Sequence, residues 1–300
     1  MNDAATTHYH DRLERVLHHI EAHLDDELSI ETLSGVAAFS KYHFHRQFTG
    51  LFGIGVHKYV QLARLKRASY RLAFRDASIV QIALDSGYEG PEAFSRAFKQ
   101  RIGQTPSDFR KQPQWIPWHA AYRPFSETRI MHMKKTRQAD AVSIVDVPDI
   151  SVAVLEHRGD PALIGDTIRA FIGWRKQVGL HPRNSATFNI FYDGPADTPP
   201  EAFRLDLCAV TEREVAPNEA GVVAKVIPGG RCAVLRHIGS DDGLGEAMAF
   251  LYTEWLPGSG EEPRDFPLYC QRVSFFPDVP EHEAVTDIFL PLQAPDRDDQ

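Results

Sequence analysis

The stretch Ser78-Ile-Val-Gln-Ile-Ala-Leu-Asp-Ser-Gly-Tyr88, followed by Glu-Gly-Pro-Glu-Ala-Phe-Ser-Arg-Ala-Phe-Lys-Gln-Arg-Ile-Gly-Gln-Thr-Pro-Ser-Asp-Phe-Arg110, holds the signals for two short helices separated by a tight turn. Ser78 and Gln81 have the spacing of a capping box, so the first helix is predicted to begin there. Gly87 is predicted to end it. The chain is therefore expected to turn sharply and start a second helix.

The second helix is predicted over residues 89–102 because its apolar residues recur at helical spacing. Phe94, Phe98 and Ile102 fall on one stripe, while the other side is polar and basic. A helix with one face buried in its own domain and one polar, cationic face is what reading of the major groove requires.

The same design occurs once upstream, 50 residues earlier by subtraction of residue numbers. The matching pairs are Phe44 with Phe94, Arg46 with Arg96, Phe48 with Phe98, Gly53 with Gly103, and Tyr59 with Phe109. A single helix-turn-helix pattern is a weak signal, but two copies joined by the basic helix around 64–75 are far more specific.

Several motifs in this region resemble the DNA-binding module of AraC/XylS-type transcription regulators. They are Ser40-Lys-Tyr-His-Phe-His-Arg-Gln-Phe48, Arg64-Leu65 with Arg67-Ala68, Ile82-Ala83, Gly87-Tyr88, Phe94-Ser-Arg-Ala-Phe-Lys99, and Gly103 with Thr105-Pro106. The resemblance covers residues 10–111. It implies two helix-turn-helix units on a linker helix, which insert recognition helices into successive major-groove turns on one face of double-stranded promoter DNA.

Candidate DNA contacts are the polar residues that lie off the apolar stripes. They are Ser40, Tyr42, His43, His45, Arg46 and Thr49 in the first unit, and Ser95, Arg96 and Lys99 in the second. The second helix starts with Gly90, Pro91, Glu92 and Ala93, none of which donates a side-chain hydrogen bond to a base. We therefore expect the first unit to read sequence and the second to anchor to the backbone.

Charge is distributed unevenly along the chain. The net charge of the whole protein is -8. Residues 40–112 contain thirteen Lys or Arg against five Asp or Glu, and residues 113–300 contain 18 basic against 28 acidic residues. This asymmetry suits contact with nucleic acid by one domain only.

The remaining composition is that of a globular protein. Its 300 residues can form two ordinary domains, and no run of eighteen apolar residues or signal peptide occurs, so we expect a cytoplasmic protein without a membrane partner. Three cysteines without a Cys-x-x-Cys pair predict no disulfide scaffold and no zinc cluster. His19 and His23 have metal-ligand spacing, but solvated histidines are the better interpretation, and no metal or other cofactor is expected.

Residues 112–141 are predicted to be a linker. Pro113, Pro117 and Pro124 argue against a continuous helix, and the basic piece 132–137 follows. The aromatic residues of this stretch indicate that it packs against a domain.

The third part of the chain, residues 142–293, shows a second internal repeat. Ala-Val-Leu-Glu-His-Arg-Gly at 153–159 aligns with Ala-Val-Leu-Arg-His-Ile-Gly at 233–239, and each copy precedes a helix that ends near a tryptophan. Two strands follow each helix. The chain is thus predicted to be multidomain: an all-α tandem helix-turn-helix domain, then an α+β domain of two strand-helix-strand-strand halves related by a pseudo-twofold axis, with a cleft between them.

This part resembles the GyrI-like, drug-sensing effector domains. The matching pieces are Phe191-Tyr-Asp-Gly-Pro195, Phe203-Arg-Leu-Asp-Leu-Cys208, Ile227-Pro-Gly-Gly230, Arg236-His-Ile-Gly239, Trp255-Leu-Pro-Gly-Ser-Gly260, Thr286-Asp-Ile288 and Leu290-Pro-Leu292. The resemblance implies a cleft for bulky aromatic, often cationic molecules, with a buried glutamate in a Pro-x-x-Glu-x-Tyr strand. Here Cys270 stands at the glutamate position and Arg272 at the tyrosine position, so the sequence does not predict selectivity for cations.

Aromatic residues remain as candidates for the walls of an effector pocket. The candidate effector-binding residues are Phe171, Trp174, Phe188, Phe191, Trp255, Tyr269, Cys270 and Phe275, with Glu156 as an alternative carboxylate.

The leading hypothesis is a ligand-responsive transcription regulator that is not an enzyme, with RNA polymerase as its expected protein partner. Two alternatives stay open. The second domain could hydrolyse a reactive ligand, with Cys270 activated by His157 or His237, or it could sequester a ligand while DNA serves only as a tether.

Overall fold

The computed structural model describes residues 3–132, 141–194 and 198–294. The chain divides into two compact units. The first contains Met1–Lys135 together with the separate segment Phe276–His282, and the second contains Thr136–Phe275 with Glu283–Gln300. Within the described residues, no helix combines the length and the hydropathy needed to cross a membrane.

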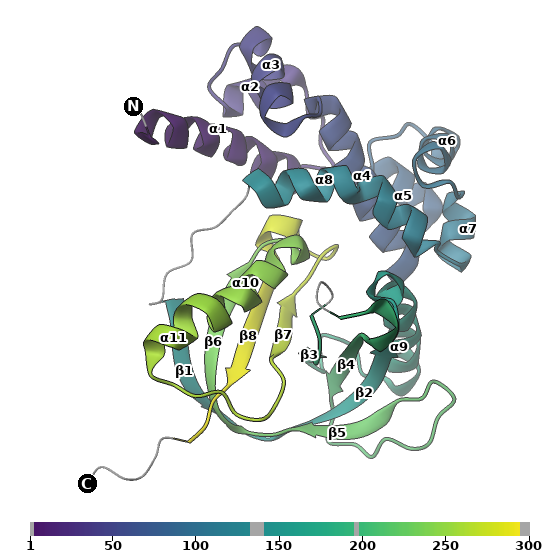
Figure 1. The fold of residues 1–300 in the computed structure, drawn as a ribbon. Coiled ribbons are helices and arrows are strands. Elements are labelled where there is room, and N and C mark those ends of the chain that lie inside the picture. Colours follow the sequence, from purple (N-terminus) through teal and green to yellow (C-terminus); the bar gives the residue numbers. More distant parts are fainter. Residues whose placement is uncertain (1–2, 133–140, 195–197, 295–300) are drawn as a thin grey trace. The chain divides into compact units, whose positions relative to one another are not determined.

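The first unit is helical (Figure 1). Its helices are α1 (Asp3–Ala22), α2 (Ile30–Val36), α3 (Lys41–Phe52), α4 (Val56–Phe74), α5 (Ile79–Asp85), α6 (Pro91–Ile102), α7 (Pro106–Lys111) and α8 (Trp115–His132). The helix pairs α2–α3 and α5–α6 are the two predicted helix-turn-helix units, and α4 connects them.

Local signals in the sequence set the helix ends as predicted. The Ser78 hydroxyl accepts a hydrogen bond from the Gln81 backbone N–H at 3.1 Å, and Ser40 does the same for His43 at 3.5 Å. Gly53 and Gly103 end the two recognition helices with φ of 68° and 86°. Glycine adopts this left-handed conformation without steric cost, so both helices stop at the same point of the repeat.

One sequence-based prediction is wrong: the stretch 112–141 contains a continuous helix, α8. Pro117 lies in its first turn, where the backbone N–H has no partner within a helix, so it costs little there. Pro124 lies inside the helix but is exposed. Burial of Trp118, Tyr122 and Phe125 on the opposite side outweighs the one hydrogen bond that Pro124 removes. The expectation that these aromatics pack against a domain is confirmed. Residues 133–140, including part of the predicted basic piece, lie outside the described residues.

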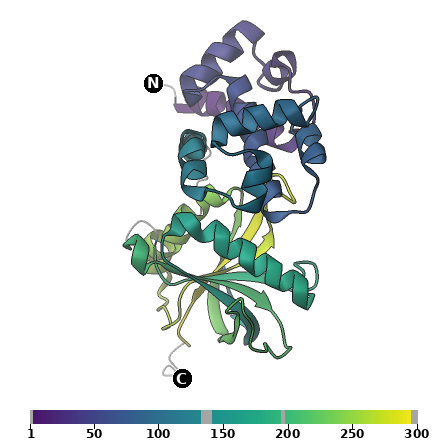
Figure 2. The same ribbon diagram turned by 90° about the vertical axis from the view of Figure 1, so that its right-hand side faces the viewer.

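The second unit is an eight-stranded antiparallel sheet with helices (Figures 1 and 2). Its elements are β1 (Val142–Val147), β2 (Ile150–Arg158), α9 (Ile164–Val178), β3 (Thr187–Phe191), β4 (Arg204–Val210), β5 (Val223–Ile227), β6 (Gly230–Ile238), α10 (Leu244–Phe250), a π-helical turn (Leu251–Trp255), α11 (Leu256–Ser259), β7 (Tyr269–Ser274) and β8 (Val285–Pro291).

The strand order, β1-β6-β8-β7-β3-β4-β2-β5, confirms the two-half architecture. Central strands β3 and β7 pair with each other, and each half continues outward with equivalent strands. The repeat is visible in side-chain detail: the imidazole Nε2 of His157 lies 3.2 Å from the Asp160 carbonyl oxygen, and that of His237 lies 2.9 Å from the Ser240 carbonyl oxygen.

The two halves exchange their first strands. β1 precedes β2 in the chain but pairs with β6 of the other half, and β5 precedes β6 but pairs with β2. Neither half therefore completes its sheet alone, which ties the two repeats into one unit.

The helical unit yields a stability prediction at α8. Phe125 is fully buried, with its ring 4.8 Å from that of Tyr59. Phe125→Ala is expected to lower the free energy of unfolding by about 3–5 kcal/mol because it removes a large buried side chain. The adjacent Pro124→Ala, on the exposed side, should not lower it, since alanine restores a backbone N–H. Urea unfolding followed by far-ultraviolet circular dichroism measures both; an equal loss in the two variants would contradict the burial argument.

Candidate nucleic-acid interface and small-molecule site

The recognition helix α3 presents its predicted contact residues to solvent. Phe44 and Phe48 are fully buried, so the residues between them face outward. Tyr42 is 77% exposed. Ser40, His43, His45 and Arg46 are exposed as well, and Thr49 is half-buried.

The second recognition helix, α6, has the same orientation relative to its core. Phe94 and Phe98 are fully buried, Arg96 and Lys99 are exposed, and Ser95 is half-buried. Glu92 is exposed in the first turn. Within the described parts of the chain, the side chains of Arg46, Arg96 and Lys99 form no ion pair, so these cations remain available to a phosphate.

The arginines of α4 serve a different purpose. Arg64 donates to the Leu24 carbonyl at 2.9 Å, Arg67 pairs with Asp25 at 2.5 Å, and Arg71 pairs with Asp85 at 2.5 Å. Burial disfavours ionisation of Asp85, but hydrogen bonds from Arg71 and Gln81 outweigh it and lower the pKa of this carboxyl. These contacts hold the helices together, so the positive charge counted in the sequence overstates what α4 offers to DNA.

Two further arginines are also engaged inside the unit. Arg101 donates to the carbonyl of Ala121 on α8, and Arg110 donates to the carbonyl of Ala77. These two arginines therefore contribute less exposed charge than the sequence count suggests.

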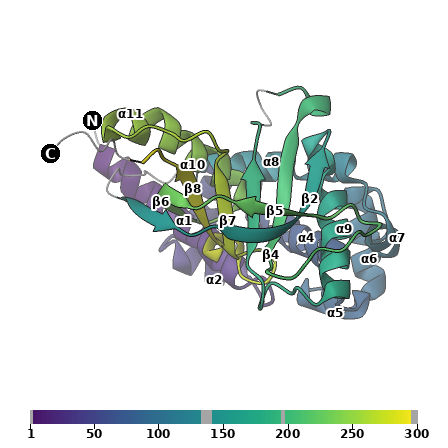
Figure 3. The ribbon, with the colours of Figure 1, turned by 90° about the horizontal axis from the view of Figure 1, so that it is seen from below.

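In the second unit, strand register decides which candidate residues can act together. Side chains at paired positions point to the same face of a sheet, and neighbours along a strand point to opposite faces. One row crosses the sheet through paired positions: Leu155, Leu207, Asn189, Cys270, Ile288 and Leu235. We call this side of the sheet the helix face, because α9 and α10 pack on it (Figure 3).

The helix face carries five of the nine predicted effector residues. Phe171 and Trp174 of α9 stack with ring centroids 5.9 Å apart and pack with Leu155 and Leu207. Trp255 packs with Cys270 on the α10 side. Phe191, half-buried, packs against both clusters, so it lies where the two halves meet.

The remaining candidates lie elsewhere, so the nine predicted residues do not form one wall. Phe188 and Tyr269 belong to a separate cluster on the opposite face, where the Tyr269 ring stacks on that of Phe289 at 4.9 Å. Glu156 lies on this face too, since its row runs through Asp206, Ile190 and Tyr269. Phe275 follows the end of β7 and is half-buried.

Glu156 is held in an ionic cluster that the sequence did not reveal. Its Oε1 lies 2.5 Å from Lys225 Nζ and 3.2 Å from Arg204 Nη2, and the fully buried Asp206 accepts from Lys225 at 2.8 Å. The hydrogen bond from Lys225 lowers the pKa of Glu156 to about 2. This carboxylate is therefore paired with cations of its own unit.

Comparison with known proteins agrees with this architecture. The GyrI-like small molecule binding domain family matches residues 140–293, and a helix-turn-helix domain family matches residues 33–112. The chain belongs to the GyrI-like family.

Individual relatives match different shares of the chain. The probable transcriptional regulator YgiV of Escherichia coli (strain K12) is 40% identical over 152 residues, which are 50% of this chain and 95% of YgiV. The right origin-binding protein of the same strain is 33% identical over 96 residues, 32% of this chain and 33% of that protein. The DNA-binding domain of AdpA, solved in complex with a target DNA, is 27% identical with a TM-score of 0.32 and covers 34% of this chain and 97% of that domain. The two family matches and the identity to YgiV make the protein an AraC-type helix-turn-helix transcription regulator with a GyrI-like small-molecule-binding domain.

Within the GyrI-like domain, sequence reasoning missed Asn189. This residue sits in the central row between Leu207 and Cys270, half-buried and next to the position where Phe191 joins the two aromatic clusters. A polar amide at the centre of an otherwise apolar row is the feature that could have indicated it, but its face becomes known only from the strand register.

Cys270 of the GyrI-like domain is fully buried, and burial raises the pKa of its thiol to about 12. His157 and His237, the predicted activating bases, instead hydrogen-bond the carbonyls of Asp160 and Ser240. The raised pKa of the thiol disfavours the thiolate that the hydrolase alternative needs. Among the described residues, no group of three or more His, Cys, Asp or Glu side chains could hold a metal ion.

The ionic cluster predicts a pH dependence of stability. Because the pKa of Glu156 falls from its ordinary 4.5 to about 2 on folding, its contribution is fully present above pH 4.5 and is lost as pH drops toward 2. Glu156→Gln is expected to be less stable than the wild type at pH 7, and the gap should close between pH 4.5 and 2. Urea midpoints across this range test it, with Glu219→Gln, an exposed carboxylate, as control; a gap that stays constant with pH would refute the assignment.

Proposed function

We propose that this regulator binds promoter DNA through the outward faces of α3 and α6, and that a small molecule held by the GyrI-like domain changes that binding. The observation that carries the DNA half is the set of exposed cations, Arg46, Arg96 and Lys99, opposite fully buried phenylalanines on two equivalent helices. Cations fixed in this way attract phosphates, and the polar residues beside them can reach base edges.

The two helices divide the work. α3 combines Arg46 with Tyr42, His43 and His45, all able to hydrogen-bond bases, so it supplies sequence discrimination. α6 begins with Pro91 and carries Glu92 in its first turn, so Arg96 and Lys99 supply affinity for the backbone.

The effector contacts lie on the helix face around Phe191. There Phe171, Trp174 and Trp255 offer aromatic surface, and Asn189 offers an amide. Because Cys270, with its protonated thiol, occupies the central row and Glu156 is paired on the opposite face, no free carboxylate of the predicted set selects cations. The ligand class is a flat aromatic or amphipathic molecule, neutral or charged.

The protein acts in this scheme without catalysing a reaction. YgiV is named a probable transcriptional regulator, and the buried thiol of Cys270 supports a non-enzymatic role. We further propose a cytoplasmic location, where promoter DNA is accessible, and RNA polymerase as the protein partner at the promoter.

The division between α3 and α6 is tested with sites selected from random duplex DNA. Arg46→Ala is expected to lower affinity for the selected site by about 1–3 kcal/mol and to flatten discrimination against mutated sites, because it removes a base-directed donor. Arg96→Ala should weaken selected and mutated sites alike and reduce the slope of affinity against salt by about one. Fluorescence anisotropy at several salt concentrations measures both, and the reverse pattern would overturn the assignment.

The effector site is tested by quenching of tryptophan fluorescence with a cationic aromatic dye and a neutral aromatic dye of similar size. The two dyes are expected to bind within about tenfold of each other, since desolvated aromatic contacts, not a carboxylate, supply the affinity. Phe191→Ala should weaken both dyes, whereas Phe188→Ala, on the opposite face, should leave both unchanged. Strong preference for the cation, or equal effects of the two variants, would contradict the proposed site.

A further inference from the structure

The helical unit contains a segment that comes from the far end of the chain. Phe276–His282 connects β7 to β8, yet it clusters with helices α1 to α8 and not with the sheet. We call it the β7–β8 segment. Its residues have no counterpart in the predicted helix-turn-helix design, so the role of this contact is unexplained by DNA binding alone.

The first end of the β7–β8 segment attaches to α4. The Phe276 ring packs edge-on against Tyr70 with centroids 5.0 Å apart. Asp278 accepts two hydrogen bonds from the Arg75 guanidinium, at 2.8 and 2.6 Å. Such a bidentate pair fixes orientation as well as distance.

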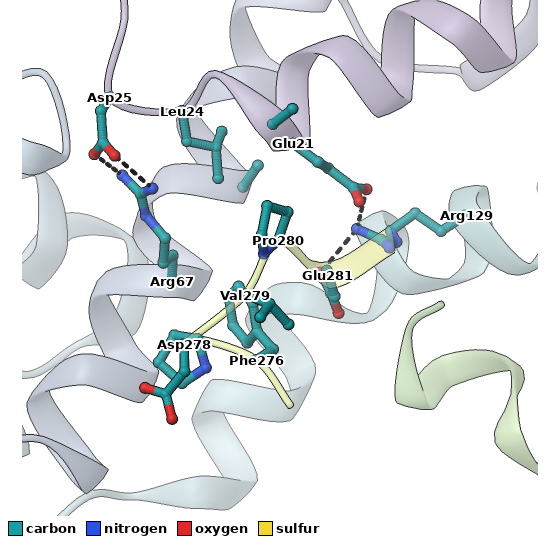
Figure 4. Close-up of a pocket in the computed structure, with 13 residues that line it drawn as sticks. Glu21, Leu24, Asp25, Arg67, Arg129, Phe276, Asp278, Val279, Pro280 and Glu281 are labelled. Carbon is teal, nitrogen blue, oxygen red and sulfur yellow. Dashed lines mark hydrogen bonds and ion pairs between the residues drawn. The ribbon is translucent and has the colours of Figure 1, made fainter. Parts of the chain in front are cut away.

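The other end enters a buried ionic cluster with residues of three helices. Figure 4 shows three of its members, Glu21, Arg129 and Glu281. Glu281 accepts from Lys66 of α4 at 2.7 Å and from Arg129 of α8 at 2.8 Å. Arg129 also lies 2.5 Å from Glu21 of α1. These four side chains are at most 10% exposed.

Burial makes this cluster sensitive to the loss of one member. A buried charge is tolerated only when opposite charges compensate it, and removing one partner costs far more than the pair contributes. Here Lys66 and Arg129 face Glu21 and Glu281, and one of these carboxylates, Glu281, is supplied by the β7–β8 segment. Withdrawing the segment leaves Lys66 and Arg129 with one negative group fewer.

The segment is attached at both ends, by Phe276 and Asp278 at one and by Glu281 at the other, and a cavity lies beside its middle. A cavity of about 210 Å³ lies between the segment and the helices, lined by Leu24, Ala63 and Arg67 on one side and by Val279 and Pro280 on the other. Detachment of the segment would break its ion pairs with Arg75, Lys66 and Arg129 together with one aromatic contact, Phe276 on Tyr70.

We propose that the β7–β8 segment is a reversible clamp through which the GyrI-like domain controls the DNA-binding unit. The segment contacts α4, which connects the two helix-turn-helix units. It also follows β7 directly in the chain, and β7 carries Cys270 in the central row of the proposed effector site. This inference rests on the proposed function. If effector binding shifts β7, it alters the contacts between the segment and α4. By the same coupling, DNA binding alters the conformation of β7.

Because coupling is reciprocal, duplex DNA can serve as the probe while the effector is unidentified. The full chain is mixed with its selected duplex, and backbone hydrogen exchange is followed by mass spectrometry. In the wild type, DNA is expected to change exchange in β7. Glu281→Gln, which keeps the shape and removes the charge, should abolish this change, raise exchange in α4 and α8, and weaken binding of the two-unit site about tenfold.

Two comparison variants complete the test. Asp278→Asn, at the exposed end of the segment, should show the same changes to a smaller degree and guards against a folding defect in Glu281→Gln. Glu219→Gln removes one exposed charge outside the segment and should match the wild type.

The possible outcomes are distinct. The clamp is overturned if Glu281→Gln and Asp278→Asn show the same exchange and DNA affinity as the wild type. It is also overturned if DNA does not change hydrogen exchange in β7 of the wild type. A wild type that selects no sequence overturns the proposed function instead, and the exchange of α4 and α8 in free Glu281→Gln still decides whether the clamp exists.

Discussion

Burial of two phenylalanines on each recognition helix is the constraint on which the DNA-binding half depends. Phe44 and Phe48 on α3, like Phe94 and Phe98 on α6, are inaccessible to solvent, so each helix has only one rotational setting about its axis. A left-handed glycine then ends each helix at the same repeat position. Because the rotation and the end of each helix are fixed in this way, Arg46 and Arg96 point to solvent. No further interaction is needed to hold them there.

Signals of this local kind were readable in the sequence, whereas pairing between distant segments was not. Caps, end glycines and the 80-residue repeat predicted the helices and the two-half architecture. Alternation along β7 could show that Tyr269 and Cys270 face opposite ways, but not which of them joins Trp255. That follows from pairing with β3 and β8, and from the exchange of β1 and β5, which local pattern does not encode.

Two sequence-based predictions were wrong for the same reason: each assumed that a residue type has the same role wherever it occurs. Proline was taken to exclude a helix, yet Pro117 in a first turn and an exposed Pro124 are compatible with α8 because its buried aromatics outweigh the lost bond. Arginine was counted as charge for DNA, yet Arg64, Arg67 and Arg71 hydrogen-bond neighbouring helices. In both cases burial decides the role, and burial depends on tertiary structure.

The same reasoning explains why an ionic cluster suits the β7–β8 segment better than an apolar one. A buried set of two cations and two carboxylates contributes little net stability, since desolvation nearly offsets the attraction, but it discriminates strongly between complete and incomplete sets. An apolar side chain in place of Glu281 would pack against the helices over a range of positions, because apolar contacts are non-directional. In this cluster Lys66 and Arg129 donate hydrogen bonds to Glu281, and Arg129 also pairs with Glu21. A contact that adds little net stability but needs one defined geometry is either formed or broken. Two such discrete states are what transmission of ligand binding to a DNA-binding unit requires.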